Sequence, residues 1–167
     1  LWFWYTVSMK KMALTMAVLL PALLAHAAYH PAAQAFYGKF AARAEKEDLN
    51  GMKALVADNA KFNLPQRGNL NKSQWARLMG NTFRAMDKFS VRYKVASVSP
   101  GGKGQMKVML SQVTSAVYKD PDGKPHTMEV SRQLEDTLTR GKSGFQLSSS
   151  KVKALTQKID GKPAKTN

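Results

Sequence analysis

Two ionisable residues, Arg132 and Asp136, interrupt an apolar segment that alternates with a period of two. The apolar positions in the same phase are Met128, Val130, Leu134 and Leu138. On a β-strand all these side chains point to one face, which we expect to be the interior face. Four strand residues separate the two charges by roughly 13 Å, too far for a direct ion pair. Each charge must therefore be satisfied by a neighbouring strand or the backbone, or line a wet pocket.

A second carboxylate, Asp58, could also serve acid-base chemistry. If it faces a cavity and burial raises its pKa, it could act as a general base. Enzymes that form an enolate combine such a base with hydrogen-bond donors to the enolate oxygen, and Tyr37 or Tyr93 could supply the donor. The catalytic hypothesis takes Asp58 or Asp136 as the base. Asp58 equally suits a turn or a cap, and tyrosines on apolar stripes are usually core residues.

The sequence predicts no metal and no cofactor. His126 and Glu129 are three residues apart, so on a strand they point to opposite faces and cannot chelate one ion. Residues 120–123, Asp-Pro-Asp-Gly, lack the later acidic ligands of a calcium loop and predict a hairpin turn. The chain has no cysteine, which excludes disulfides and thiolate sites. Phosphate-binding loops and nucleophile motifs are also absent from the sequence.

The chain is strongly basic, with a formal net charge of +15 over 167 residues. Such a field attracts nucleic acid and other polyanions through a salt-sensitive, mostly nonspecific interaction. The basic residues are dispersed rather than gathered into one run, and no aromatic-rich RNA-binding signature accompanies them. A solvated surface is therefore favoured over dedicated nucleic-acid binding.

The first 27 residues have the three parts of a secretory signal peptide. Met9-Lys10-Lys11 begins a basic stretch, Met12 to Leu24 is an apolar run, and Ala25-His26-Ala27 is a small-x-small cleavage signal. We expect a start at Met9, cleavage after Ala27, and export to the periplasm or the medium. Residues 1–8 are interpreted as upstream sequence. A retained membrane anchor is the alternative, although the run is short for a span of about 20 residues, and no stable span is expected after cleavage.

The segment after residue 27 begins with three expected helices. Apolar residues recur at three- and four-residue spacing between Ala33 and Lys46, which predicts the first helix. A short second helix follows Asp48 as its N-cap. Asn71 and Gln74 resemble a capping pair before a third helix over about residues 72–88.

From Phe89 onward the apolar period changes from 3.6 to 2, which predicts a series of strands. A shift in phase near Ser111-Gln112 predicts a bulge in one bent strand. Residues 28–160 form the expected domain, and residues 161–167 a loose C-terminal tail. Helices followed by an antiparallel meander predict an α+β fold that buries one sheet face against the helices. A strongly bent sheet leaves a hollow at its wide end, and such hollows commonly bind ligands.

Four short motifs resemble the SnoaL-like branch of the nuclear transport factor 2-like superfamily. They are Glu-Asp-Thr-Leu-Thr-Arg at 135–140, Gly-Phe-Gln-Leu at 144–147, Ser-Lys-Val at 150–152 and Ile-Asp-Gly-Lys-Pro at 159–163. The resemblance spans about Ala32 to Pro163, and Leu138 and Phe145 stand where that branch often has tryptophans. It implies a cone-shaped barrel, in which a strongly bent antiparallel sheet wraps over about three N-terminal helices. It does not imply one activity, because this fold hosts isomerases, cyclases, dehydratases and transport adaptors.

Three functions are compatible with these observations. The leading hypothesis is a noncatalytic exported domain that binds a small, partly apolar molecule in the cone. Its expected lining is Tyr37, Trp75, Tyr93, Arg132 and Asp136. The alternatives are an acid-base enzyme of isomerase or cyclase type with Asp58 or Asp136 as base, and an interaction module that forms a homodimer through the outer sheet face.

Overall fold

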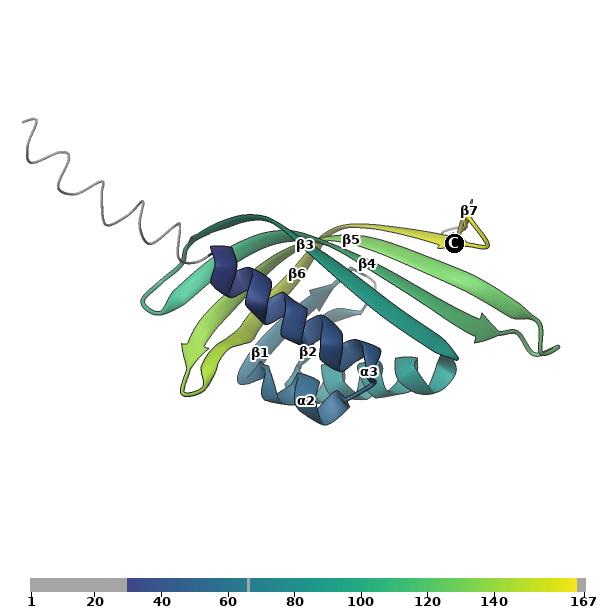
Figure 1. Ribbon diagram of the computed structural model, residues 1–167, viewed down its shortest axis with the longest axis horizontal. Coiled ribbons are helices and arrows are strands. Elements are labelled where there is room, and N and C mark those ends of the chain that lie inside the picture. Colours follow the sequence, from purple (N-terminus) through teal and green to yellow (C-terminus); the bar gives the residue numbers. More distant parts are fainter. Residues whose placement is uncertain (1–29, 66, 165–167) are drawn as a thin grey trace, which may run out of the picture.

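The computed structural model describes residues 30–65 and 67–164. The expected signal peptide therefore lies outside the described residues. Figure 1 shows one layer of helices beneath a broad, curved sheet, and the β4 and β5 ends extend beyond the helices. None of the helices in the described ranges combines the length and apolarity needed to cross a bilayer.

The three helices follow the expected pattern of apolar residues. The first helix ends at residue 45 and buries one stripe against the sheet, which consists of Ala33, Phe36, Tyr37, Phe40 and Ala44. Helix α2 (Leu49–Ala54) begins at Asp48, whose side chain accepts a hydrogen bond from the Gly51 amide. Helix α3 (Lys72–Ala85) begins with the reciprocal capping box of Asn71 and Gln74. These contacts satisfy amide groups that a helix end would otherwise leave unpaired.

The sheet has the order β2-β1-β6-β5-β4-β3, with the short β7 paired to β6. Its strands are β1 (Val56–Leu64), β2 (Gly68–Asn71), β3 (Lys88–Pro100), β4 (Gln105–Lys119), β5 (Pro125–Gly141), β6 (Gly144–Ile159) and β7 (Lys162–Pro163). All neighbours pair antiparallel except β1 and β6, which run parallel. The α+β prediction of helices followed by a large curved sheet is therefore confirmed.

The sheet bends at places other than the predicted bulge. Strand β4 keeps one phase throughout: Met106, Val108 and Leu110 are buried, and Thr114 and Ala116 continue inward. The bulge expected near Ser111-Gln112 was wrong, because polar residues simply occupy inward positions there. Register shifts occur instead in the β3–β4 pair, between Val95 and Ser97, and in the β5–β6 pair. Such irregularities increase local twist and curve a sheet.

The chain also continues in ordered structure beyond the expected domain end. Residues 162–163 form β7 and pair with β6, so the first part of the expected loose tail is a hairpin. The turn residues Asp160 and Gly161 both have positive φ, 50° and 76°. This combination is typical of a tight type I′ turn, for which Asp-Gly is a favoured pair.

Candidate functional site

A cavity of about 350 Å³ lies between the helices and the inner face of the sheet. Most of its wall is apolar. The helices contribute Tyr37, Phe40, Trp75, Leu78, Met79 and Thr82, and Met86 follows the end of α3. The sheet contributes Phe62, Leu64, Phe89, Tyr93, Gln112, Thr114, Met128, Val130, Arg132, Leu134, Asp136, Leu147, Ser150, Val152 and Leu155. Pro65 and Arg67, between β1 and β2, complete the lining. A volume of this size holds a small organic molecule.

Asp136 is the most deeply buried ionisable group of this site, with 2% of its surface exposed. The Tyr37 hydroxyl donates to its Oδ2 at 2.7 Å, which joins the first helix to the centre of β5. Its other oxygen, Oδ1, is buried and has no hydrogen-bond partner of good geometry among the described residues, although Ser150 stands opposite on β6. Burial raises the pKa of Asp136 to about 6, and the Ser150 and Tyr37 hydroxyls oppose that rise.

Arg132 lies on the same inner face of β5, one strand away from Gln112 on β4. Its Nη1 donates to Gln112 Oε1 at 3.0 Å, and Gln112 Nε2 donates to the Tyr93 hydroxyl at 3.0 Å. The three side chains form one polar row across β5, β4 and β3. Burial lowers the pKa of Arg132, and no carboxylate of the described chain lies within ion-pair distance of its guanidinium.

Aromatic rings form part of the cavity wall beside Asp136 and the polar row of Arg132, Gln112 and Tyr93. Tyr37 and Tyr93 pack with ring centroids 5.1 Å apart. Tyr37, the hydrogen-bond partner of Asp136, therefore contacts Tyr93, the last residue of the polar row. Trp75 on α3 stacks on Phe62 of β1 at 5.0 Å, with the rings 7° from parallel. Burial raises the pKa of both Tyr37 and Tyr93, so both hydroxyls keep their protons at neutral pH.

The structure places Tyr37, Trp75, Tyr93, Arg132 and Asp136 together on the cavity wall. Their role in binding stays a prediction. Two other lining groups, Gln112 and Thr114, were not anticipated, because the interior phase of β4 had been interrupted at Ser111-Gln112 by the predicted bulge. A continuous count of alternate residues from Met106 would have found both.

Asp58 does not reach the cavity. It belongs to β1, its side chain is fully exposed, and it pairs with Lys72 Nζ at 2.8 Å. Lys72 also donates to the Val56 carbonyl, so the pair ties the start of α3 to β1. This ion pair lowers the pKa of Asp58, the reverse of what a general base at neutral pH needs.

His126, which we did not expect to bind a metal ion together with Glu129, contacts two aspartates. His126 Nδ1 lies 2.7 Å from Asp160 Oδ2, and its Nε2 lies 3.2 Å from Asp120 Oδ2. None of the three residues belongs to the cavity lining, and they tie the β4–β5 hairpin to the β6–β7 turn. The hydrogen bonds with Asp160 and Asp120 raise the pKa of His126. No cluster of three or more metal-ligating side chains suited to an ion occurs in residues 30–65 and 67–164.

The cone of helices and bent sheet, hollow at its centre, is the nuclear transport factor 2-like fold. Solved structures with this architecture match most of the chain. A conserved protein from Planctomyces limnophilus has a TM-score of 0.65 at 13% identity, covering 74% of this chain and 94% of that one. Hexachlorocyclohexane dehydrochlorinase LinA-type3 from Novosphingobium barchaimii has a TM-score of 0.63 at 12% identity, with coverages of 81% and 93%.

A third match carries the name of the fold. It is a candidate dehydratase of the nuclear transport factor 2-like family from Streptomyces avermitilis, with a TM-score of 0.61 at 14% identity, covering 76% of this chain and 96% of that one. No family model and no curated protein sequence matches the chain. The predicted fold is confirmed, and at these identities the likeness concerns the fold alone.

Proposed function

We propose that this protein is an exported, noncatalytic domain that binds a small, largely apolar molecule in its cavity. The observation that carries the proposal is the hollow of about 350 Å³, whose wall is mostly apolar and most of whose polar groups lie on the inner sheet face. An apolar wall supplies binding free energy through buried area, and a few placed polar groups supply orientation. The export part rests on the residue pattern of positions 9–27.

The geometry favours binding over catalysis at Asp136. A general base must reach the proton that it abstracts, but this carboxylate is 2% exposed and its Oδ2 is held by Tyr37. Its Oδ1 has no hydrogen-bond partner among the described residues, but that atom is also buried.

An acid-base enzyme remains the second candidate because one observation supports it. Burial brings the pKa of Asp136 to about 6, close to the range in which a base works efficiently at neutral pH. This reading requires turnover of a carbonyl compound that Asp136→Asn abolishes, and a variant with unchanged turnover would end it.

A homodimer through the outer sheet face is the third candidate. Part of that face carries ion pairs within the chain, Lys153 with Glu135 at 3.0 Å and Lys158 with Glu129 at 4.0 Å. These charges would need desolvation on pairing. A strict monomer in sedimentation at high concentration would rule the dimer out.

The binding proposal is tested with the neutral fluorescent probe N-phenyl-1-naphthylamine. We expect the purified protein to bind it stoichiometrically and to release it when decanol is added. Leu78→Trp places a larger side chain into the cavity from α3, so it should weaken binding at least tenfold. Ala85→Trp, an exposed position at the end of the same helix, is the matched control and should bind as the parent does.

The control separates occupancy of the cavity from binding to exposed surface. Equal affinity in the parent, Leu78→Trp and Ala85→Trp proteins would show that the probe binds elsewhere. Absence of binding to the parent would contradict the proposed function directly.

A further inference from the structure

We propose that the cavity selects a monocarboxylate with an apolar body, and that Arg132 and Tyr93 hold its carboxylate. This inference rests on the proposed function and names the ligand class of the same site. It starts from a charge that the described chain leaves without a counter-ion inside an apolar hollow.

Arg132 is a mostly buried cation with a single described hydrogen bond, from Nη1 to Gln112. A guanidinium has five N–H donors in a fixed fork that matches the two oxygens of a carboxylate. Arg132 is partly buried, and desolvation of a charge that lacks an ionic partner costs free energy. The remaining donors therefore suit an anion that enters with the ligand.

The neighbouring groups hold Arg132 ready for such a ligand. Gln112 uses its carbonyl oxygen for Arg132 and its amide nitrogen for Tyr93, which fixes the direction of both side chains. The Tyr93 oxygen is an acceptor in that bond, so its own proton is available for a further acceptor. Arg132 on β5 and Tyr93 on β3 thus offer two kinds of donor from either side of β4, and Gln112 on β4 bridges them.

The charge of the ligand follows from the charges of the site. Asp136 is on the same strand, about 13 Å from Arg132 by strand rise, and it already has Tyr37 as partner. A ligand with one negative charge would neutralise Arg132 alone. A phosphate monoester would bring a second negative charge into a mostly apolar wall, in which Arg67 is the only other cationic residue among the described lining, and desolvation opposes that.

The test compares decanoate with decanol, which share an apolar chain and differ in the charged head. Displacement of N-phenyl-1-naphthylamine reports both affinities at a pH where the carboxylic acid is ionised. We expect the parent to prefer decanoate by about 10- to 100-fold, the range of a charge-assisted hydrogen bond. Arg132→Met should abolish this preference, because it removes the charge while it keeps the length and apolarity of the arginine stem.

Arg92→Met is the matched control. Arg92 is exposed on the opposite face of β3, next to Tyr93 in sequence, and its replacement lowers the net charge by the same unit. We expect it to keep the decanoate preference, which separates a local contact from general attraction to a basic protein. Loss of preference in both variants would overturn the assignment to Arg132.

The possible outcomes distinguish this inference from the proposed function. If the parent binds neither compound, the proposed function fails. If the parent binds decanoate and decanol equally, the cavity binds apolar molecules but the carboxylate inference is wrong. This outcome is measured on the parent protein alone, so it does not depend on whether a variant folds. If Arg132→Met keeps the preference, the carboxylate lies elsewhere and the inference is also overturned.

Discussion

At the scale of single residues, Asp136 sets a pH dependence of opposite sign to that of an ordinary surface carboxylate. The pKa of Asp136 is about 6 in the folded protein, against 3.8 for a free aspartate side chain. Between these two pH values the folded state holds more protons than the unfolded state, so the Asp136 contribution to stability falls as pH rises. The difference amounts to roughly 3 kcal/mol, lost between about pH 4 and pH 6.

Asp136→Asn tests this dependence because asparagine keeps the acceptor for Tyr37 and cannot ionise. We expect the free energy of unfolding of the variant, relative to the parent, to rise as pH increases from 4 to 6. Urea denaturation at a series of pH values measures it. Asp58→Asn is the control. The ion pair with Lys72 lowers the pKa of the exposed Asp58, so the stability of this variant relative to the parent should fall, not rise, as pH increases. A relative stability of Asp136→Asn that does not change with pH would contradict the assignment.

The sequence located the two interior charges but not their partners. Alternation along one strand was enough to place Arg132 and Asp136 inward, because strand geometry is local. Tyr37 is 99 residues from Asp136 in sequence, and nothing in local spacing indicates which donor meets which acceptor. Asp58 was misplaced for a related reason: a strand follows α2 directly, and its outward phase became visible only with that strand.

At the scale of elements, the capping box of Asn71 and Gln74 fixes where α3 begins, and α3 forms part of the cavity wall. Asn71 accepts from the Gln74 amide at 2.9 Å, and Gln74 Oε1 accepts from the Asn71 amide at 2.9 Å. We expect Asn71→Ala to lower the free energy of unfolding by about 1 kcal/mol, because it leaves amide groups of the first turn unpaired. Urea denaturation measures the loss.

Replacement by another capping residue supplies the control for α3. Asn71→Ser keeps a side-chain acceptor at the N-cap and should recover most of the lost stability. If alanine and serine variants are equally unstable, the effect comes from other contacts of Asn71 and not from the cap.

The sequence left out strand β2 and the pairing of β1 with a strand far along the chain. Helices were readable because their caps and apolar stripes are local. Strand β2 is four residues long and β1 joins the sheet through a parallel contact with β6, about 90 residues away. The β6–β7 hairpin is different, since Asp160-Gly161 between Ile159 and Lys162 is a recognised turn signal. It was overlooked because the surrounding Gly, Pro and Lys residues resemble a loose tail.

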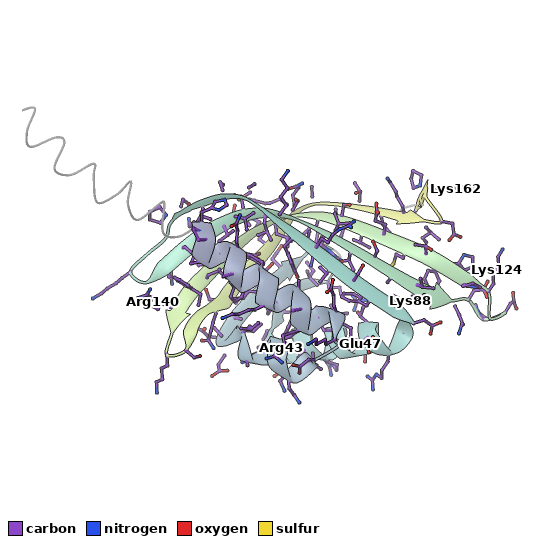
Figure 2. All side chains as sticks on the ribbon, in the orientation of Figure 1. Arg43, Glu47, Lys88, Lys124, Arg140 and Lys162 are labelled. Atoms are coloured by element: carbon purple, nitrogen blue, oxygen red, sulfur yellow. The ribbon has the colours of Figure 1, made fainter. Side chains whose placement is uncertain are left out.

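At the scale of the whole molecule, dispersed positive charge surrounds one buried site. Figure 2 shows the labelled basic residues at distant points, with Arg140 at one end of the molecule and Lys124 and Lys162 at the other. No single basic face results from this distribution of labelled groups, in keeping with the sequence, where lysines are spread along the chain. The summed field still attracts anions from any direction.

This arrangement predicts that salt acts on the approach of a carboxylate more than on its final contact. The Debye length falls from about 10 Å at 0.1 M salt to about 3 Å at 1 M, so attraction by exposed charges is screened. The contact with Arg132 is mostly buried and screened much less. Between these salt concentrations, we expect the association rate constant of decanoate to fall by on the order of tenfold while its dissociation rate constant stays nearly unchanged.

Stopped-flow displacement of N-phenyl-1-naphthylamine measures both rate constants, and decanol corrects for the effect of salt on apolar binding, because it lacks the charge. For decanol the association rate constant should not fall with salt. If salt instead accelerates decanoate dissociation, the carboxylate is held by exposed lysines and arginines at the surface. A dissociation rate constant that does not change in high salt would instead place the carboxylate at Arg132, a partly buried cation without an ionic partner in the described chain.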